Sequence, residues 1–483
     1  MDTKLISRLL ALLMFAMPFG AGSQTFSLPE MGDSSREILG AGQENRLGRA
    51  IFENFLNSGI VIEDPILQQY IESVGHQVAT NAFSDTGGYV FFLVNDRSIN
   101  AFALPGGYIG VNTGLLTATR TESELAGVLA HELAHVTQRH IARGIEDQTR
   151  LKVPKAAAML AGILLASQGG ADAGAAAVSG MMAADLQHQI NFTRRHESEA
   201  DRVGVDLLVK SGYDPEGLPD FFQRLYEASR SYGTNVPEFL RTHPVETRRI
   251  SETRDRIAQL GASGKRRADP LDYHVAQARA LVLSTQSHST LATRFEGAIN
   301  SGSNRDSAGQ RYGMALSQLR AGNMAGARAE TDRLLQTHPE YLPFLLLSAE
   351  IDLQSGQADL ALERYQEAAK LYPGDYTLAL SQATALIEVG RYKSAMNLLR
   401  EQLQPNILRT GAYAMFARAA RGAGLISESH ASMAEYYALR GDVRQAIEQT
   451  ELALSAADAT PYQRSRLQAQ LETLRNRAAE DEA

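Results

Sequence analysis

The sequence of 483 residues contains no cysteine and no tryptophan. The absence of cysteine excludes disulfides, thiolate metal ligands, cysteine nucleophiles and lipid attachment through cysteine. A metal site in this chain must therefore use His, Asp and Glu, and there are only 11 histidines. An excess of basic charge is also lacking, since 47 Lys and Arg stand against 55 Asp and Glu, a formal net charge of −8. This balance argues against a nucleic-acid partner and against a general binder of anionic membranes.

The composition is otherwise that of a folded globular chain. Hydrophobic residues make up 44% and charged residues 21%, which argues against a disordered or fibrous protein. At roughly 150 residues per domain, the length suggests about three domains.

The N-terminal residues have the pattern of an export signal. Lys4 and Arg8 form a short basic start, an apolar run follows over residues 9–19, and small residues come next at 21–23. This order is typical of a secretory signal peptide, which we place at residues 1–23. A membrane anchor is the alternative, but the run is well short of the roughly 20 residues that span a bilayer. We therefore expect the mature chain in the periplasm or outside the cell.

A second apolar segment, residues 153–186, is rich in Ala, Gly and Met. Lys155 lies at its start and Gly169, Gly170 and Asp172 interrupt it, so each half is too short to span a membrane. We favour a buried or lid-like helical hairpin. The alternative is a segment that touches a membrane or gates substrate, so peripheral membrane contact stays open.

Local patterns predict a mostly helical protein with a small β component. We expect helices over residues 37–82, 121–143 and 191–211, a strand over 89–94, and two extended pieces joined by a turn at 105–107. Pro65 suits a first helical turn, so a helix restarts after Asp64. Thr121 followed by Glu124 is a capping pattern at the start of another helix.

The C-terminal part repeats with a strict period. Steps of 34 residues separate four glycines, and three alanines and two prolines keep the same step: Gly322, Gly356, Gly390, Gly424; Ala327, Ala361, Ala395; Pro339, Pro373. This period, with small residues where helices cross and Pro after the second helix, is typical of tetratricopeptide repeats. Pro405 comes two residues early and Ser429 replaces an expected Ala, so the last helices can form an irregular cap. A generic helical bundle is the alternative.

The sequence His131-Glu132-Leu133-Ala134-His135 lies in the helix predicted over 121–143. Residues 131 and 135 share one helix face one turn apart, so their imidazoles can bind one cation. Zn²⁺ accepts neutral imidazole nitrogens, and a catalytic site needs three protein ligands. Glu132 flanks the metal and can take a proton from water and pass it to a leaving amine. The alternative, a surface helix with incidental histidines, does not fit the apolar residues around the motif.

The third ligand must come from another segment. A metzincin would have Gly at 138 and His at 141, but the chain has Gln138 and Ile141, which excludes that class. Glu197 and Asp201 lie one turn apart on the helix predicted over 191–211. Glu197 can reach the metal while Asp201 accepts a hydrogen bond from a ligand imidazole and fixes its tautomer. Glu132 and Asp201 are thus the candidate catalytic residues, and His131, His135 and Glu197 the candidate metal ligands.

Other polar residues near these motifs are weaker candidates. His196 is an alternative ligand, although we expect it in a solvated basic stretch, and we expect Glu199 on another helix face. We interpret His140 as structural. His243, held before Pro244 in an extended turn, can approach the metal. It can act as a fourth, regulatory ligand that makes the site latent, it can stabilise an oxyanion, or it can be a loop residue without function.

The extended pieces within residues 100–116 supply a further element. A strand beside the metal helix can pair with an extended substrate backbone. An ordinary core hairpin is equally consistent with the sequence.

Four motifs together resemble the M48 family of zinc metallopeptidases: HELAH at 131–135, NAFALPGG at 100–107, ESEAD at 197–201 and THP at 242–244. With the repeats and the export signal, nearly the whole mature chain is similar to periplasmic members of this family in Gram-negative bacteria. The resemblance implies a gluzincin-like site holding one Zn²⁺ per chain, with His243 able to restrain activity. It also implies outer-membrane protein quality control, in which the repeats contact misassembled barrel proteins and the barrel-assembly machinery. Some relatives have membrane spans; because this chain has no convincing span, we do not carry membrane insertion over to it.

The expected fold class is α+β and mostly helical, with a gluzincin-like HExxH metalloprotease domain followed by an α-solenoid of tetratricopeptide repeats. The expected division is a signal peptide at 1–23, the protease domain at 24–262, a helical linker at 263–306 and the repeat domain at 307–477.

Two functions remain open from the sequence. The first is a periplasmic zinc metalloendopeptidase whose repeats recruit unfolded or misassembled outer-membrane proteins for degradation or assembly. The second is mainly a chaperone or binding module with a latent protease site. The intact HExxH motif favours retained catalysis, because a pure chaperone has no use for Glu132.

Overall fold

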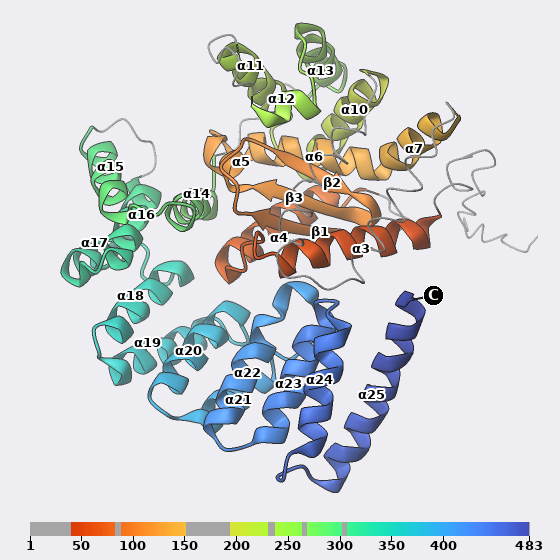
Figure 1. The fold of residues 1–483 in the computed structure, drawn as a ribbon. Coiled ribbons are helices and arrows are strands. Elements are labelled where there is room, and N and C mark those ends of the chain that lie inside the picture. Colours follow the sequence, from red (N-terminus) through yellow and green to blue (C-terminus); the bar gives the residue numbers. More distant parts are fainter. Residues whose placement is uncertain are drawn as a thin grey trace, which may run out of the picture.

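The computed structural model describes residues 40–82, 88–150, 194–229, 237–262, 268–301 and 307–482. The predicted signal peptide and the segment 153–186 lie outside the described residues. The fold is α+β and mostly helical, with a small sheet in the N-terminal half and an arc of helices in the C-terminal half (Figure 1). Within the described part of the chain, no helix is long and apolar enough to cross a membrane.

The sheet has three strands: β1 (Val90–Val94), β2 (Ala101–Leu104) and β3 (Tyr108–Asn112). Their order is β1-β3-β2, with β3 parallel to β1 and antiparallel to β2, so β2 lies at an edge. The predicted strand and the two extended pieces are confirmed. The turn between them is a short 3-10 helix, η1 (Pro105–Gly107), in which Gly106 adopts φ 75°, a left-handed conformation that suits glycine.

Side chains of β1 alternate between two apolar cores, as the period of a strand requires. Phe92 and Val94 pack with Phe52 and Phe55 of α3 (Ala41–Asn57). Phe91 and Leu93 belong to the main core, to which α4 (Pro65–Ala79) and α6 (Glu122–Thr137) contribute. Helix α6, which carries the HExxH motif, is therefore held against the sheet by a large buried core.

The other helices of this half are α5 (Thr113–Ala118), α7 (His140–Arg150), α10 (Arg194–Ser211), α11 (Gly217–Ser229), α12 (Glu238–Thr242) and α13 (Thr247–Gln259). Two of the predicted helix starts are confirmed. The Asp64 side chain accepts a hydrogen bond from the backbone N–H of Leu67 at 3.1 Å. Thr121 does the same for the N–H of Glu124, also at 3.1 Å.

The prediction of one continuous helix over residues 121–143 was wrong. The chain breaks after Thr137, and Arg139 adopts φ 52° before α7 begins at His140. A guanidinium nitrogen of Arg139 lies 2.8 Å from a carboxylate oxygen of Glu44 in α3. This tertiary contact stabilises the left-handed backbone conformation of Arg139, which no local sequence pattern predicts.

Two helices, α14 (Leu271–Leu283) and α15 (His288–Asn300), connect the halves. Tyr273, Ala276 and Ala280 of α14 belong to the main core of the first half. Val275 and Val282 on its other side belong to the first core of the helical arc. The helix α14 is therefore packed on two sides.

Antiparallel helix pairs follow: α16 (Ser307–Arg320) with α17 (Met324–Thr337), α18 (Leu342–Gln354) with α19 (Ala358–Leu371), α20 (Tyr376–Glu388) with α21 (Tyr392–Arg400), and α22 (Gly411–Gly422) with α23 (Ile426–Leu439). The four glycines at the 34-residue step lie between the helices of each pair, with φ between 75° and 81°. The 3-10 helix η2 (Ile407–Arg409) precedes α22, and α24 (Val443–Ser455) and α25 (Pro461–Glu482) end the arc. The predicted tetratricopeptide array is confirmed.

The end of the array returns to the first half of the molecule (Figure 1). Arg440, which follows α23, is buried and donates to the backbone oxygen of Leu56 at 2.6 Å. It also pairs with the carboxylate of Glu63 at 2.8 Å.

Candidate metal centre

Helix α6 presents His131, Glu132 and His135, and all three are at most 1% exposed. The Nε2 atoms of His131 and His135 lie 3.1 Å apart, so the two rings converge on one point as their i, i+4 spacing predicts. The apolar sides of α6 pack into the main core, which fixes the direction in which the rings project.

Helix α10 places the two predicted carboxylates against these rings. It crosses α6 closely at Gly204, where an added Cβ would lie only 3.2 Å from the backbone nitrogen of His131. Glu197 oxygens lie 3.4 Å from Nε2 of His131 and 3.5 Å from Nε2 of His135. Asp201 lies 2.9 Å from the opposite nitrogen of His131, Nδ1. This is the arrangement expected for a ligand and for a carboxylate that orients a ligand.

His243 reaches the same point from the end of α12. Its backbone N–H donates to the carbonyl of Phe239 at 2.7 Å, and its ring is 1% exposed. Nδ1 of His243 lies 3.3 Å from Nε2 of His131 and 3.2 Å from each oxygen of Glu197. Its other nitrogen lies 3.4 Å from Oε1 of Glu132. The structure thus brings together the six residues named as site candidates from the sequence.

The donor set fits one metal ion. One ligand atom from each of His131, His135, Glu197 and His243 lies within 4.8 Å of the others. Zinc–nitrogen distances of about 2.0–2.1 Å require donors roughly 3.3 Å apart, and the contacts above span 3.1 to 3.5 Å. Burial lowers the pKa of His131, yet hydrogen bonds to Asp201 and Glu197 raise it to about 9. The cluster therefore favours a positive charge at this point.

The three buried carboxylates differ in their electrostatics. Burial opposes the charge of Glu197, but the neighbouring histidines outweigh it and hold its pKa well below the usual value. Burial likewise opposes the charge of Asp201, and the Arg249 guanidinium overrides it and lowers that pKa. In Glu132 burial dominates and raises the pKa. Glu132 consequently has the higher proton affinity that a general base needs.

Arg249 of α13 is a site residue that the sequence reasoning missed. It is buried, and its guanidinium holds both oxygens of Asp201 at 2.7 and 2.8 Å. It also lies 3.0 Å from Glu197 and donates to the backbone oxygen of Pro244 at 2.8 Å. One cation thus pairs with two buried carboxylates and holds the segment that carries His243. The only signal in the sequence was an Arg five residues after the His-Pro pair.

The remaining nearby residues lie behind the donors. The expectation that His196 is solvated was wrong, because it is 4% exposed and stacks on His140 with ring centroids 4.5 Å apart. His196 lies outside the set of four convergent donors. Glu199 is on another face, as expected, and contacts His140 and Arg143. His140 is buried with Nδ1 2.8 Å from Nδ1 of His135, a contact that sequence reasoning missed.

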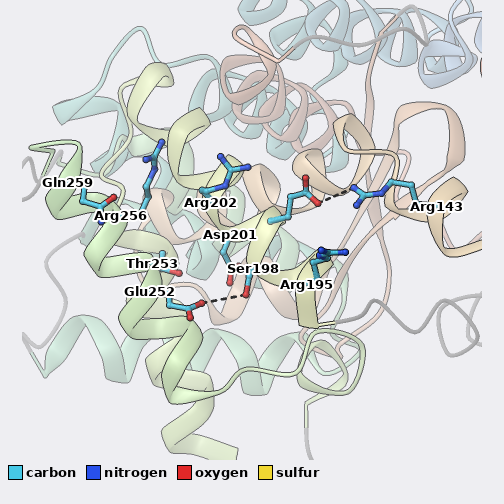
Figure 2. Close-up of a pocket in the computed structure, with 10 residues that line it drawn as sticks. Arg143, Arg195, Ser198, Asp201, Arg202, Glu252, Thr253, Arg256 and Gln259 are labelled. Atoms are coloured by element: carbon cyan, nitrogen blue, oxygen red, sulfur yellow. Dashed lines mark hydrogen bonds and ion pairs between the residues drawn. The ribbon is translucent and has the colours of Figure 1, made fainter. Parts of the chain in front are cut away.

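A cavity of about 580 Å³ opens on the outer side of α10, between α7 and α13. Figure 2 shows Arg143 and Arg195 at one side of it and Arg256 and Gln259 at the other. Asp201 reaches this cavity, whereas its lining includes none of the four donors. It is therefore not the space in which a substrate would meet the metal centre.

The edge strand β2 runs beside Glu132. A backbone hydrogen bond links Ala103 to the Glu132 carboxylate, while Oε1 of Glu132 has no hydrogen bond among the described residues. The edge strand and the candidate base are therefore direct neighbours.

Two histidines and a glutamate that converge on one point, with a second glutamate beside them, are the residues of a metalloprotease centre of the HExxH class. The family model of peptidase family M48 matches residues 65–257. The chain is 33% identical over 480 residues to the beta-barrel assembly-enhancing protease of Escherichia coli (strain K12), with 98% of each chain covered. It is 33% identical to the protein of the same name from Yersinia pestis, again with 98% of each covered.

A third relative matches over a shorter stretch of the chain. The mitochondrial metalloendopeptidase OMA1 of Arabidopsis thaliana is 29% identical over 184 residues, which is 38% of this chain and 35% of that protein. The chain belongs to peptidase family M48 and is a metalloprotease.

Proposed function

We propose that the chain is a zinc-dependent metalloendopeptidase that binds one Zn²⁺ through His131, His135 and Glu197. The convergence of these three donors on one buried point, with Glu132 beside it, supports this assignment most directly. Imidazole nitrogen and carboxylate oxygen are ligands that zinc accepts, and no thiolate is available in the chain.

A cation held here supplies Lewis-acid chemistry, which polarises a peptide carbonyl and makes water easier to deprotonate. Glu132 takes the proton of the attacking water at its carboxylate and passes it to the leaving amine. Asp201 holds the Nδ1 proton of His131, so that Nε2 keeps its lone pair toward the metal. The outer edge of β2 binds the substrate backbone in an extended form beside Glu132.

We further propose that His243 is a regulatory fourth ligand. Its Nδ1 lies with the other three donors, and its Nε2 points to Glu132. In this position the imidazole closes the set of four protein donors and stands where the substrate carbonyl would lie. Catalysis then requires the segment around Pro244 to move.

The setting is proposed from the relatives and the N-terminal pattern. Proteins named beta-barrel assembly-enhancing proteases match over 98% of their length. We propose that this chain is exported to the periplasm of a Gram-negative cell and acts on misassembled outer-membrane barrel proteins. The repeats recruit these clients and the barrel-assembly machinery. The proposed division is 1–23 signal peptide, 24–262 protease, 263–306 linker and 307–477 repeats.

The substitution Glu132→Gln tests the catalytic assignment. It keeps the shape of the side chain and removes the base, so kcat on casein and on an unfolded barrel protein should fall by roughly 10²–10⁴-fold. Zinc content, measured by mass spectrometry, should stay at one per chain. Glu122→Gln, at a buried carboxylate far along the same helix, is the control and should retain activity. Persistent cleavage by a zinc-loaded Glu132→Gln protein would show that the assignment is wrong.

The same variant distinguishes the second candidate function, a chaperone or binding role, from proteolysis. If Glu132→Gln still supports barrel assembly in cells that lack the wild-type protein, the chain has a binding role independent of cleavage. Loss of both functions would show that assembly depends on proteolysis.

The substitution His243→Ala tests latency. It should raise basal cleavage of casein on the order of tenfold, for which a change of about 1.4 kcal/mol suffices. His76→Ala, at an exposed histidine of α4, should leave the rate unchanged. Equal or lower activity of His243→Ala would favour oxyanion stabilisation or no role.

A further inference from the structure

The two imidazole ligands of the metal centre are held in different ways. Nδ1 of His131 meets the carboxylate of Asp201 directly at 2.9 Å. Nδ1 of His135 meets another imidazole, that of His140, at 2.8 Å between the two Nδ1 atoms. A carboxylate accepts at any neutral pH, but an imidazole accepts only when its proton lies on the other nitrogen. The group that fixes the proton position in His140 therefore also decides which nitrogen of His135 carries its proton.

The fold places His140 by breaking the helix. Arg139 in its left-handed conformation separates α6 from α7 and turns residue 140 back toward the centre. His140 is fully buried, and its ring stacks on His196 with an interplanar angle of 16°. In an uninterrupted helix, at about 100° per residue, residue 140 would lie about 140° around the helix axis from residue 135, on another face.

The other nitrogen of His140 faces a carboxylate. Its Nε2 lies 3.3 Å from Oε2 of Glu199, and Arg143 contacts the same oxygen at 3.0 Å. Glu199 lines the outer cavity, beside which Figure 2 shows Arg143, and its side chain is 25% exposed. The charge of this carboxylate thus lies near solvent and near its own cation, away from the four donors.

With a neutral His140 ring, one arrangement of protons satisfies both of these contacts. An ionised carboxylate only accepts, so Nε2 of His140 carries the proton that Glu199 receives. Nδ1 of the neutral His140 ring then has a lone pair, which accepts the Nδ1 proton of His135. Nε2 of His135 is left with its lone pair directed at the other donors, as a metal ligand must be.

We propose that His140 is a positioning residue for the metal ligand His135. Glu199 fixes the tautomer of the His140 ring, and His140 in turn fixes the tautomer of His135. The relay does for His135 what Asp201 does for His131, with a neutral ring in place of a carboxylate. This arrangement adds no further negative charge to a centre in which a single cation, Arg249, already serves both Glu197 and Asp201. The inference rests on the proposed metal site, because His135 needs a fixed tautomer only if it binds metal.

The test compares His140→Phe with His196→Phe. The first keeps a ring in the stack but removes both nitrogens, and the second replaces the stacking partner without touching the relay. His140→Phe should weaken zinc binding roughly 10–100-fold in competition with a chelator, and His196→Phe should stay within about twofold of wild type. Nitrogen NMR of the metal-free protein should show His135 as the Nδ1–H tautomer in wild type and as a mixture in His140→Phe.

A second pair of variants keeps the test decisive if His140→Phe does not fold. Glu199 is partly exposed, so Glu199→Gln and Glu199→Leu should fold. The amide oxygen of Gln can still accept from His140, so Glu199→Gln should keep the tautomer and most of the zinc affinity. Glu199→Leu should lose affinity several-fold and mix the tautomers of His135. Rescue by Gln but not by Leu is not expected from a merely structural role.

The outcomes separate the relay from the metal site. Unchanged zinc affinity and an unchanged His135 tautomer in His140→Phe, or in Glu199→Leu if the former does not fold, would overturn the relay. Failure of the wild-type protein to bind zinc would instead overturn the proposed function. A zinc-binding wild type with unaffected variants leaves the proposed function standing and removes the inference alone.

Discussion

The metal centre and the repeat array are built on opposite principles. At the metal centre the contacting residues are far apart in the chain: 112 residues separate His131 from His243, and 48 separate Asp201 from Arg249. In the array the contacting residues are close in sequence. Asp352, for example, pairs with Arg328, 24 residues before it, and with Arg364, 12 residues after it. Damage to the centre should therefore spread through several buried charges, whereas damage to the array should stay within neighbouring repeats.

Arg249→Met should produce the largest effect, because it leaves Asp201 and Glu197 as buried carboxylates without their cation. Removing one partner of a buried ion pair costs about 3–5 kcal/mol. The free energy of unfolding of the first half should fall by this amount, measured by urea unfolding and by hydrogen exchange of α10. Zinc affinity should fall as well, since both carboxylates prefer to protonate when Arg249 is lost.

The neighbouring Arg248 provides the control. Its side chain is 69% exposed and pairs only with Glu252 on the same helix in the contacts of the described residues. Arg248→Met should change stability by less than about 0.5 kcal/mol. An equal effect of both substitutions would mean that the buried charges of the centre are not coupled as described.

Ala327→Leu should have an intermediate and local effect. Ala327 is fully buried in the core of the first repeat, and overpacking of such a position costs about 1–3 kcal/mol. Hydrogen exchange should increase in α16 and α17 and stay unchanged around α6. Ala329→Leu, two residues further on the exposed face of the same helix, should be nearly neutral. Faster hydrogen exchange in α6 would contradict the expectation that damage to the array stays within neighbouring repeats.

Gly356→Ala should have the smallest effect. Gly356 has φ 78°, and an added Cβ would meet no atom within 4 Å, so the penalty comes from the backbone alone. A left-handed non-glycine residue costs roughly 1–2 kcal/mol. Gly297→Ala in α15 also has free space but no positive φ, and it should stabilise the chain by about 0.5–1 kcal/mol. Thermal unfolding of both variants measures this difference in sign.

The same contrast explains how far the sequence could be read. The repeats were predictable because each glycine, alanine and proline acts within its own helix pair, so the period of 34 residues carries the structure. The HExxH helix was predictable because residues 131 and 135 lie on the same helix and share a face. Arg249 and His140 were not, because their roles depend on where another segment places a carboxylate or an imidazole.

The broken helix after Thr137 illustrates the limit physically. Nothing in residues 121–143 forbids a continuous helix, since the sequence there contains neither Pro nor a late Gly stop. The ion pair between Arg139 and Glu44 of α3, together with burial of His140, favours the left-handed turn. A local propensity of a few tenths of a kcal/mol per residue yields to such tertiary contacts.

The sequence by itself determined the candidate ligand types, the two i, i+4 pairs at 131/135 and 197/201, and the repeat period, because each depends on chemistry or spacing within one helix or one helix pair. Only the tertiary structure decided that α10 approaches α6 at Gly204, that His243 lies against the other three donors, that Arg249 pairs with two carboxylates, and that His140 lies behind His135. These contacts depend on packing between distant segments, and burial makes each charge there require a partner.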